Sequence, residues 1–153
     1  MKSLKLFLLT MLINIVIFTV FFSTSFGAGA CTMSSISSSD IAYVTWVCTA
    51  DASDGSFPST VTSSPTLRGW VYVVDVTPGA VTPTPGSGFT LISSASGVDV
   101  MGGNASTMLG ESPSRAIPQA SGWINGTLTP VITGNSVNSA IFTIRATIWK
   151  QRN

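Results

Sequence analysis

The sequence of 153 residues is long enough for one domain of ordinary size and leaves little room for a second. Only 8% of the residues are charged, with 7 Lys and Arg against 6 Asp and Glu, and there is no His. The missing histidine excludes a Ser-His-Asp triad and a His-based zinc site, and a net charge of +1 offers no basic patch for nucleic acid. With 23 Ser, 19 Thr, 14 Gly and 8 Pro, the composition favours short strands and tight turns over a helical bundle.

Residues 1–30 have the order of a secretory signal peptide. Lys2 and Lys5 form a short basic region, residues 6–22 are mostly apolar, and Ala28-Gly29-Ala30 is a small-residue cleavage site. We therefore expect cleavage after Ala30. The alternative is an uncleaved signal anchor, because the apolar run is close to the shortest length that spans a bilayer.

Cleavage after Ala30 would make Cys31 the first residue of the mature chain. One interpretation is a Cys31–Cys48 disulfide formed in an oxidising compartment, since two cysteines allow only this internal pair. The other is a lipoprotein with an acylated Cys31, although Ala28 stands where a large aliphatic residue is usual. We expect a membrane contact only through an uncleaved N-terminal segment or an acylated Cys31.

The first strand of the domain is predicted from Ile41, where apolar and polar residues begin to alternate. Val44, Trp46 and Cys48 lie on the side that we expect to face the core. Residues 51–55 then have the composition of a turn.

Residues 68–77 give the strongest strand pattern in the chain. Both faces are largely apolar, which predicts a central strand. One predicted face holds Trp70, Tyr72, Val74 and Val76, and the other holds Val71, Val73 and Asp75.

Further short strands are predicted at residues 89–93, 98–101, 123–133 and 140–149, after a stiff Pro/Gly loop at 78–88. Pro130 restricts its strand to an edge or a bulge. In the last strand we expect an alternating pattern, with Phe142, Ile144, Ala146 and Ile148 inside and Thr143, Arg145, Thr147 and Trp149 outside. The predicted fold class is all-β, a single β-sandwich of immunoglobulin-like or jelly-roll-like type over residues 31–153.

The acidic residues do not form a recognisable catalytic or metal-binding motif. Asp51 and Asp54 precede Gly55 without the further oxygen ligands that a calcium loop needs, so they indicate a turn. Asp75 and Asp99 could be drawn as a glycosidase pair, but nothing in the sequence joins them. We predict no enzyme activity, no catalytic residues, no metal and no cofactor.

The four tryptophans allow a sugar-binding platform, but aromatic residues in strand patterns more often pack in a core. These are Trp46, Trp70, Trp123 and Trp149. Trp149 is the candidate for an exposed contact, because it lies on the outward side of the last strand.

Two motifs carry a resemblance to a known family. They are Gly-Val-Asp-Val-Met-Gly-Gly at 97–103 and Gly-Asn-Ser-Val-Asn-Ser-Ala at 134–140, accompanied by Thr77-Pro78-Gly79 and Phe89-Thr90-Leu91. With these motifs, residues 41–149 resemble small β-rich structural proteins of tailed bacteriophages and prophages. The resemblance implies a virion protein and brings no catalytic residues with it.

Two functions from different classes follow as expectations. The first is a non-enzymatic virion structural protein, head-decoration-like or a minor particle component, that packs on other virion proteins or on copies of itself and not on nucleic acid. The second is an exported binding module or lipoprotein of the cell envelope that recognises glycan or protein. The expected location is the virion, or the periplasm or extracellular space after cleavage near Ala30.

Overall fold

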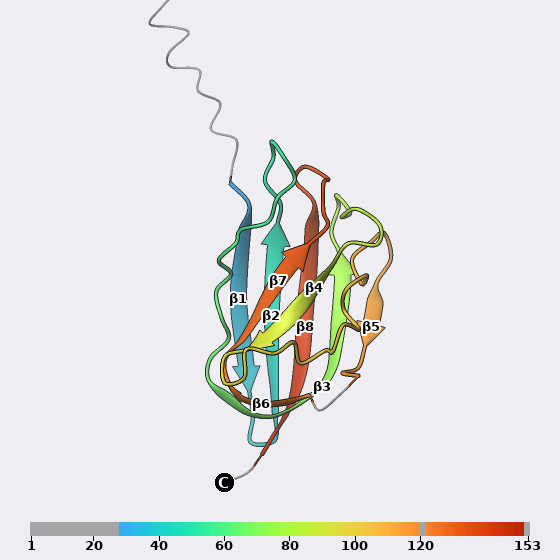
Figure 1. The fold of residues 1–153 in the computed structure, drawn as a ribbon. Helices are drawn as coiled ribbons and strands as arrows, with labels where there is room; N and C mark the ends of the chain where they lie inside the picture. Colours follow the sequence, from blue (N-terminus) through green and yellow to red (C-terminus); the bar gives the residue numbers. More distant parts are fainter. Residues whose placement is uncertain (1–27, 120–121, 152–153) are drawn as a thin grey trace, which may run out of the picture.

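The computed structural model describes residues 28–119 and 122–151, so most of the expected signal peptide lies outside the described residues. This part of the chain forms eight strands and no helix (Figure 1). The strands are β1 (Ala30–Ser37), β2 (Ile41–Thr49), β3 (Leu67–Pro78), β4 (Gly88–Ser93), β5 (Ser114–Ala116), β6 (Trp123–Gly126), β7 (Leu128–Thr133) and β8 (Ile141–Lys150). The all-β prediction is confirmed.

The strands form two antiparallel sheets. The larger sheet has six strands in the order β1-β2-β8-β3-β5, and β6 pairs with β3 on the same side as β5. The smaller sheet contains β4 and β7 alone. In Figure 1, β4 and β7 cross in front of the larger sheet at an angle to its strands. One face of the larger sheet is therefore covered, and we call the opposite, uncovered face the outer sheet face.

The hydrophobic core lies between the two sheets and follows the alternation predicted for β2 and β8. Every second residue of each strand is buried, which confirms both predicted core faces. Phe89 and Leu91 of β4 and Leu128 of β7 close the core from the other side. A fully buried Leu or Phe stabilises the fold by about 1.5–3 kcal/mol. The buried residues of the larger sheet include Ala42, Val44, Trp46, Cys48, Phe142, Ile144, Ala146 and Ile148.

Strand β3 lies inside the larger sheet, as predicted, but the prediction of its two faces is wrong. A β-bulge between Val71 and Val73 shifts the pairing with β8 and leaves Tyr72 as the additional residue. The side chains therefore change face within the strand: Trp70 and Tyr72 are exposed, whereas Val74 is buried. Before the bulge Val71 is buried, and after it the buried residues are Val74 and Val76, which belong to the other alternating set. Both alternating sets of the sequence are therefore apolar.

Two predicted strands differ in the structure. Residues 98–101 form turns and one isolated bridge, between Ile92 and Asp99. The predicted strand at 123–133 divides at Thr127 into β6 in the larger sheet and β7 in the smaller one. Pro130 lies in β7, an edge strand, which agrees with the restriction that proline imposes.

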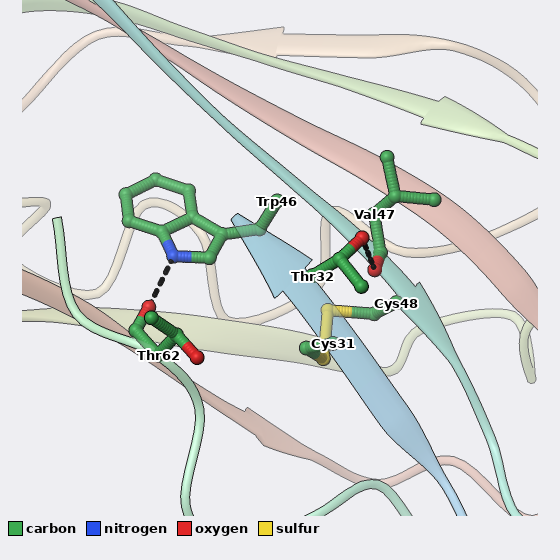
Figure 2. The surroundings of a disulfide bond; sticks show 6 residues. All are labelled: Cys31, Thr32, Trp46, Val47, Cys48 and Thr62. Atoms are coloured by element: carbon green, nitrogen blue, oxygen red, sulfur yellow. Dashed lines mark hydrogen bonds between the residues drawn. A yellow bond between two sulfur atoms is a disulfide. The ribbon is translucent and has the colours of Figure 1, made fainter. Parts of the chain in front are cut away.

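Strand β1 is joined to β2 by a disulfide as well as by the strand pairing. Cys31 and Cys48 are register partners with Cα atoms 4.0 Å apart, and their sulfur atoms are bonded (Figure 2). Cys48 is fully buried, and Cys31 packs against the core. The indole N–H of the neighbouring Trp46 donates to the Thr62 carbonyl oxygen at 2.9 Å (Figure 2). The start of the domain is therefore held by a covalent bond, and in this structure the Cys31 thiol is not available for acylation.

Candidate functional site

The strand register collects aromatic residues at one end of the outer sheet face. Ile41 of β2 is paired with Trp149 of β8, Trp149 with Trp70 of β3, and Trp70 with Trp123 of β6. The rings of Trp70 and Trp123 are in edge-to-face contact with centroids 5.1 Å apart. Trp149 is 62% exposed and Trp70 is 49% exposed. Four strands thus contribute to one row of large apolar side chains in contact with solvent.

Tyr72 and Ile117 extend this aromatic end toward the middle of the face. The bulge in β3 directs Tyr72 outward, with 64% of the side chain exposed, and Ile117 follows β5 and is 63% exposed. Together with Trp70 and Trp149 they line a shallow depression of about 500 Å³. Such a group of exposed aromatic and aliphatic side chains is typical of a binding surface.

A row of charged side chains crosses the same face next to the aromatic end. The register pairs Thr45 with Arg145, Arg145 with Asp75, and Asp75 with Arg115. The Arg115 Nε donates to the Asp75 carboxylate at 2.5 Å, and this hydrogen bond together with the negative charge raises the pKa of Arg115. Both side chains are in contact with solvent, so the pair orients these groups more than it stabilises the fold.

Arg145 has a different partner. Its guanidinium lies 4.3 Å from the centroid of the Tyr43 ring, a cation–π contact. Among the described residues, no carboxylate lies within 4 Å of it. The positive charge of Arg145 is therefore held in place on the face without being neutralised by a neighbouring carboxylate.

The charged row and the aromatic end form one continuous surface. A shallow depression of about 670 Å³ connects Trp149 and Tyr72 with Tyr43, Asp75 and Arg145. Another, of about 950 Å³, continues from the charged row toward β1. The surface combines large apolar side chains with a few oriented charged groups, an arrangement that suits the binding of another molecule.

The structure brings together some of the residues considered from the sequence and separates others. Trp149 is exposed, as predicted, and Trp70 and Trp123 lie beside it, whereas Trp46 is buried in the core. The sequence reasoning therefore missed an aromatic group formed by three of the four tryptophans. No local signal in the sequence indicates this group, because Trp70, Trp123 and Trp149 lie on strands that are distant in the chain and meet only through strand pairing.

The two acids considered as a glycosidase pair have separate structural roles. Asp75 pairs with Arg115 on the outer sheet face. Asp99 lies beside the smaller sheet, where its carboxylate accepts hydrogen bonds from the backbone N–H groups of Leu91, Met101 and Gly103 at 2.9–3.1 Å. Its two oxygens thus fix the turn that follows β4.

Asp51 and Asp54 form the turn that the sequence predicts. The Asp51 carboxylate accepts from the hydroxyl and the backbone N–H of Ser53, which lowers the pKa of Asp51. Asp54 accepts from the backbone N–H of Ser56 at 2.8 Å. Within residues 28–119 and 122–151, no group of three or more His, Cys, Asp or Glu residues could hold a metal ion.

The described part of the chain contains no helix long and apolar enough to cross a membrane. Comparisons with protein-family models, with curated proteins and with solved structures found no match.

Proposed function

We propose that the chain forms a single β-sandwich, of immunoglobulin-like or jelly-roll-like type, and is a non-enzymatic structural protein of a phage particle. In this proposal it is a head-decoration-like or minor component that packs its outer sheet face on another virion protein. The observation that carries the proposal is the group of exposed aromatic side chains around Trp149, Trp70 and Tyr72. The family resemblance of residues 97–103 and 134–140 supports the particle as the place of action.

The composition of the outer sheet face suits a protein partner. Trp, Tyr and Arg are the residues that most often dominate the binding energy of protein interfaces. An aromatic side chain presents about 200 Å² of surface, so fully covering the exposed parts of Tyr72 and Trp149 would supply up to about 3 kcal/mol each of hydrophobic free energy, before the entropic cost of association is subtracted. Asp75 and Arg115 already form an ion pair on this face, so covering this pair would bury little net charge.

The disulfide bears on where the protein assembles. Disulfides form and persist in oxidising compartments and are rare in the cytosol. The Cys31–Cys48 bond therefore supports a mature chain that is exported after cleavage near Ala30, or that is oxidised once the particle leaves the cell. A membrane contact would require that the N-terminal segment stays uncleaved or that Cys31 is acylated instead of forming the disulfide.

Mass spectrometry of purified particles from the phage or prophage that encodes the chain tests this function. The expected result is a constant, stoichiometric amount of the chain in the particles. Particles carrying a Trp149→Ser/Tyr72→Ser chain should lose most of it, whereas Val98→Ser, at a loop residue that is 61% exposed, should leave incorporation unchanged. Absence of the wild-type chain from the particles would refute the proposal.

The second candidate is an exported module of the cell envelope that binds glycan or protein. The depression between Trp70, Tyr72, Trp149 and Ile117 favours it, because flat aromatic rings can stack on the apolar face of a sugar ring. Asp75 and Arg115, on the same face, could add hydrogen bonds to hydroxyl groups.

A glycan array with the purified protein distinguishes the two candidates. Binding that is lost in Trp149→Ala and retained in Val98→Ala would support the envelope module. No binding to any glycan, together with the chain's presence in particles, would reject it.

A further inference from the structure

The free edges of the two sheets offer a possible contact that is separate from the outer sheet face of the proposed function. These edges differ in how they are protected against pairing with another molecule. An edge strand exposes unpaired backbone N–H and C=O groups, which can pair with a strand of another molecule. Natural proteins prevent this with proline, charge, bulges, short strands or covering loops. The larger sheet ends at β1 on one side and at β5 and β6 on the other, while β4 and β7 are both edges of the smaller sheet.

The free edge of β4 is covered by the loop that follows it. The backbone N–H of Phe89 donates to the Ala105 carbonyl oxygen at 3.0 Å, and the N–H of Val100 donates to the Leu91 carbonyl oxygen at 2.9 Å. The two segments approach so closely that a Cβ atom on Gly88 would collide with the Ser106 backbone. No strand from another molecule could pair there without displacing this loop.

Two further edges carry their own protection. At β7, the Ser64 N–H donates to the Leu128 carbonyl oxygen at 2.8 Å, and Pro130 has no N–H to offer. At the far side of the larger sheet, β5 has three residues and β6 has four, and Pro113 and Pro118 flank β5. These strands are too short and too interrupted to support a long intermolecular ladder.

Strand β1 carries no such protection in its own sequence or in its pairing with β2. It has eight residues, contains no charged residue and no proline, and pairs with β2 in unbroken register. Most of its side chains are exposed, including those of residues 34–37. The segment between β2 and β3 runs beside β1 in Figure 1, and its Thr62 carbonyl oxygen accepts from the Trp46 indole (Figure 2). Among the described residues, no backbone hydrogen bond joins this segment to β1.

The pairing with β2 determines which backbone groups of β1 point outward. The 4.0 Å separation of the Cys31 and Cys48 Cα atoms identifies a non-hydrogen-bonded pair, since hydrogen-bonded pairs lie about 5.5 Å apart. The alternate residues Cys31, Met33, Ser35 and Ser37 therefore direct their N–H and C=O groups away from β2. Among the described strands, only β2 pairs with β1, so no strand pairs with these groups.

We propose that β1 pairs antiparallel with β1 of a second copy of this chain, across a two-fold axis at Ser34. In this register Ser35 pairs with the partner's Met33, and Ser37 with the partner's Cys31. Every outward backbone group of the four alternate residues then has a partner, which no other antiparallel register achieves. The register places no charged side chain opposite another. The net charge is +1 for the full sequence, and residues 31–153 carry 5 Lys and Arg against 6 Asp and Glu, so repulsion between copies is small in either form.

The register is tested by cysteine cross-linking of the protein as purified. Ser34→Cys brings two introduced thiols together at a non-hydrogen-bonded pair, where the Cα separation of about 4.5 Å suits a disulfide. We expect a covalent dimer on a non-reducing gel. Peptide mass spectrometry should identify the bond between the two introduced thiols at position 34, together with the intact Cys31–Cys48 bond. Thr32→Cys is the matched control, because it lies on the same side of β1 and faces Ile36 of the partner subunit; it should give no covalent dimer.

Light scattering across a concentration series provides the second measurement. The wild-type chain should become dimeric as its concentration rises, and Ser35→Pro should lose the dimer. Ser35→Pro removes only an outward N–H, so its thermal unfolding should stay close to that of the wild type. A wild-type chain that is monomeric throughout, or equal cross-linking at positions 32 and 34, would overturn the proposal. Trp149→Ser should still cross-link in the Ser34→Cys background, so failure of the outer sheet face and failure of the β1 edge are distinguishable.

Discussion

Removing the Cys31–Cys48 disulfide should destabilise the domain by an amount that depends on the length of the loop that the bond closes. The bond joins residues separated by 17 positions. Closing a loop of that size lowers the conformational entropy of the unfolded chain, which raises the free energy of the unfolded state by about 3 kcal/mol at 25 °C. Strand β1 pairs with β2 alone, so without the bond only the strand ladder and a few contacts hold it. For a domain of this size, the loss corresponds to a fall in Tm of about 10 °C.

The assay compares urea unfolding of the oxidised protein, the protein reduced with a phosphine, and the Cys31→Ala/Cys48→Ala variant. The reduced protein and the variant should both unfold at a lower urea concentration, and hydrogen exchange should show the β1 amides to be the first to lose protection. Stability within about 0.5 kcal/mol of the oxidised protein would refute the reasoning, because it would mean that the bond does not constrain the unfolded chain.

Three further outcomes follow from individual contacts. Asp99→Ala removes the carboxylate that accepts three backbone N–H groups and should destabilise the fold by about 3 kcal/mol in urea unfolding, whereas a change below about 1 kcal/mol would contradict this role. Trp46→Phe keeps a buried ring but leaves the Thr62 carbonyl oxygen without its donor, so we expect a loss of about 1 kcal/mol in the same measurement. The hydroxyl and N–H of Ser53 lower the pKa of Asp51, so the stabilisation is present above the ordinary aspartate pKa and is lost as the pH falls through the lowered value. Thermal unfolding of Asp51→Asn should therefore differ from the wild type near neutral pH and converge with it in strong acid; a constant difference would contradict the assignment.

The sequence predicts those strands whose alternation is regular and whose core face is strongly apolar. In β2 and β8 the buried positions are the expected ones, because each strand keeps one face toward the core along its whole length. In β3 the alternation breaks at Tyr72, and a bulge cannot be distinguished from a strand that is buried on both faces by periodicity alone. The sequence pattern does not predict β1, since its serines show no apolar alternation and its pairing depends on β2.

The candidate site is less accessible to sequence reasoning than the strands are. Trp149 could be placed outside because it belongs to a regular strand with a known core face. Its neighbours could not be identified, since Trp70 and Trp123 reach it through strand pairings between distant parts of the chain. The same holds for Arg145, whose contact with Tyr43 depends on the register of β2 against β8. The residues of the outer sheet face come together through the register between strands that are distant in the chain, and local sequence patterns do not determine that register.

Hydroxyl-radical footprinting of the isolated protein and of the same protein in its assembled particle tests the role of the outer sheet face most directly. Oxidation of Trp149 and Tyr72 should be rapid in the isolated protein, in keeping with their exposed rings, and at least about tenfold slower in the particle once they are covered. Val98 and Val131, which are exposed on other parts of the molecule, should react equally in both states. Unchanged oxidation of Trp149 and Tyr72 in the particle would contradict the claim that the protein packs through this face.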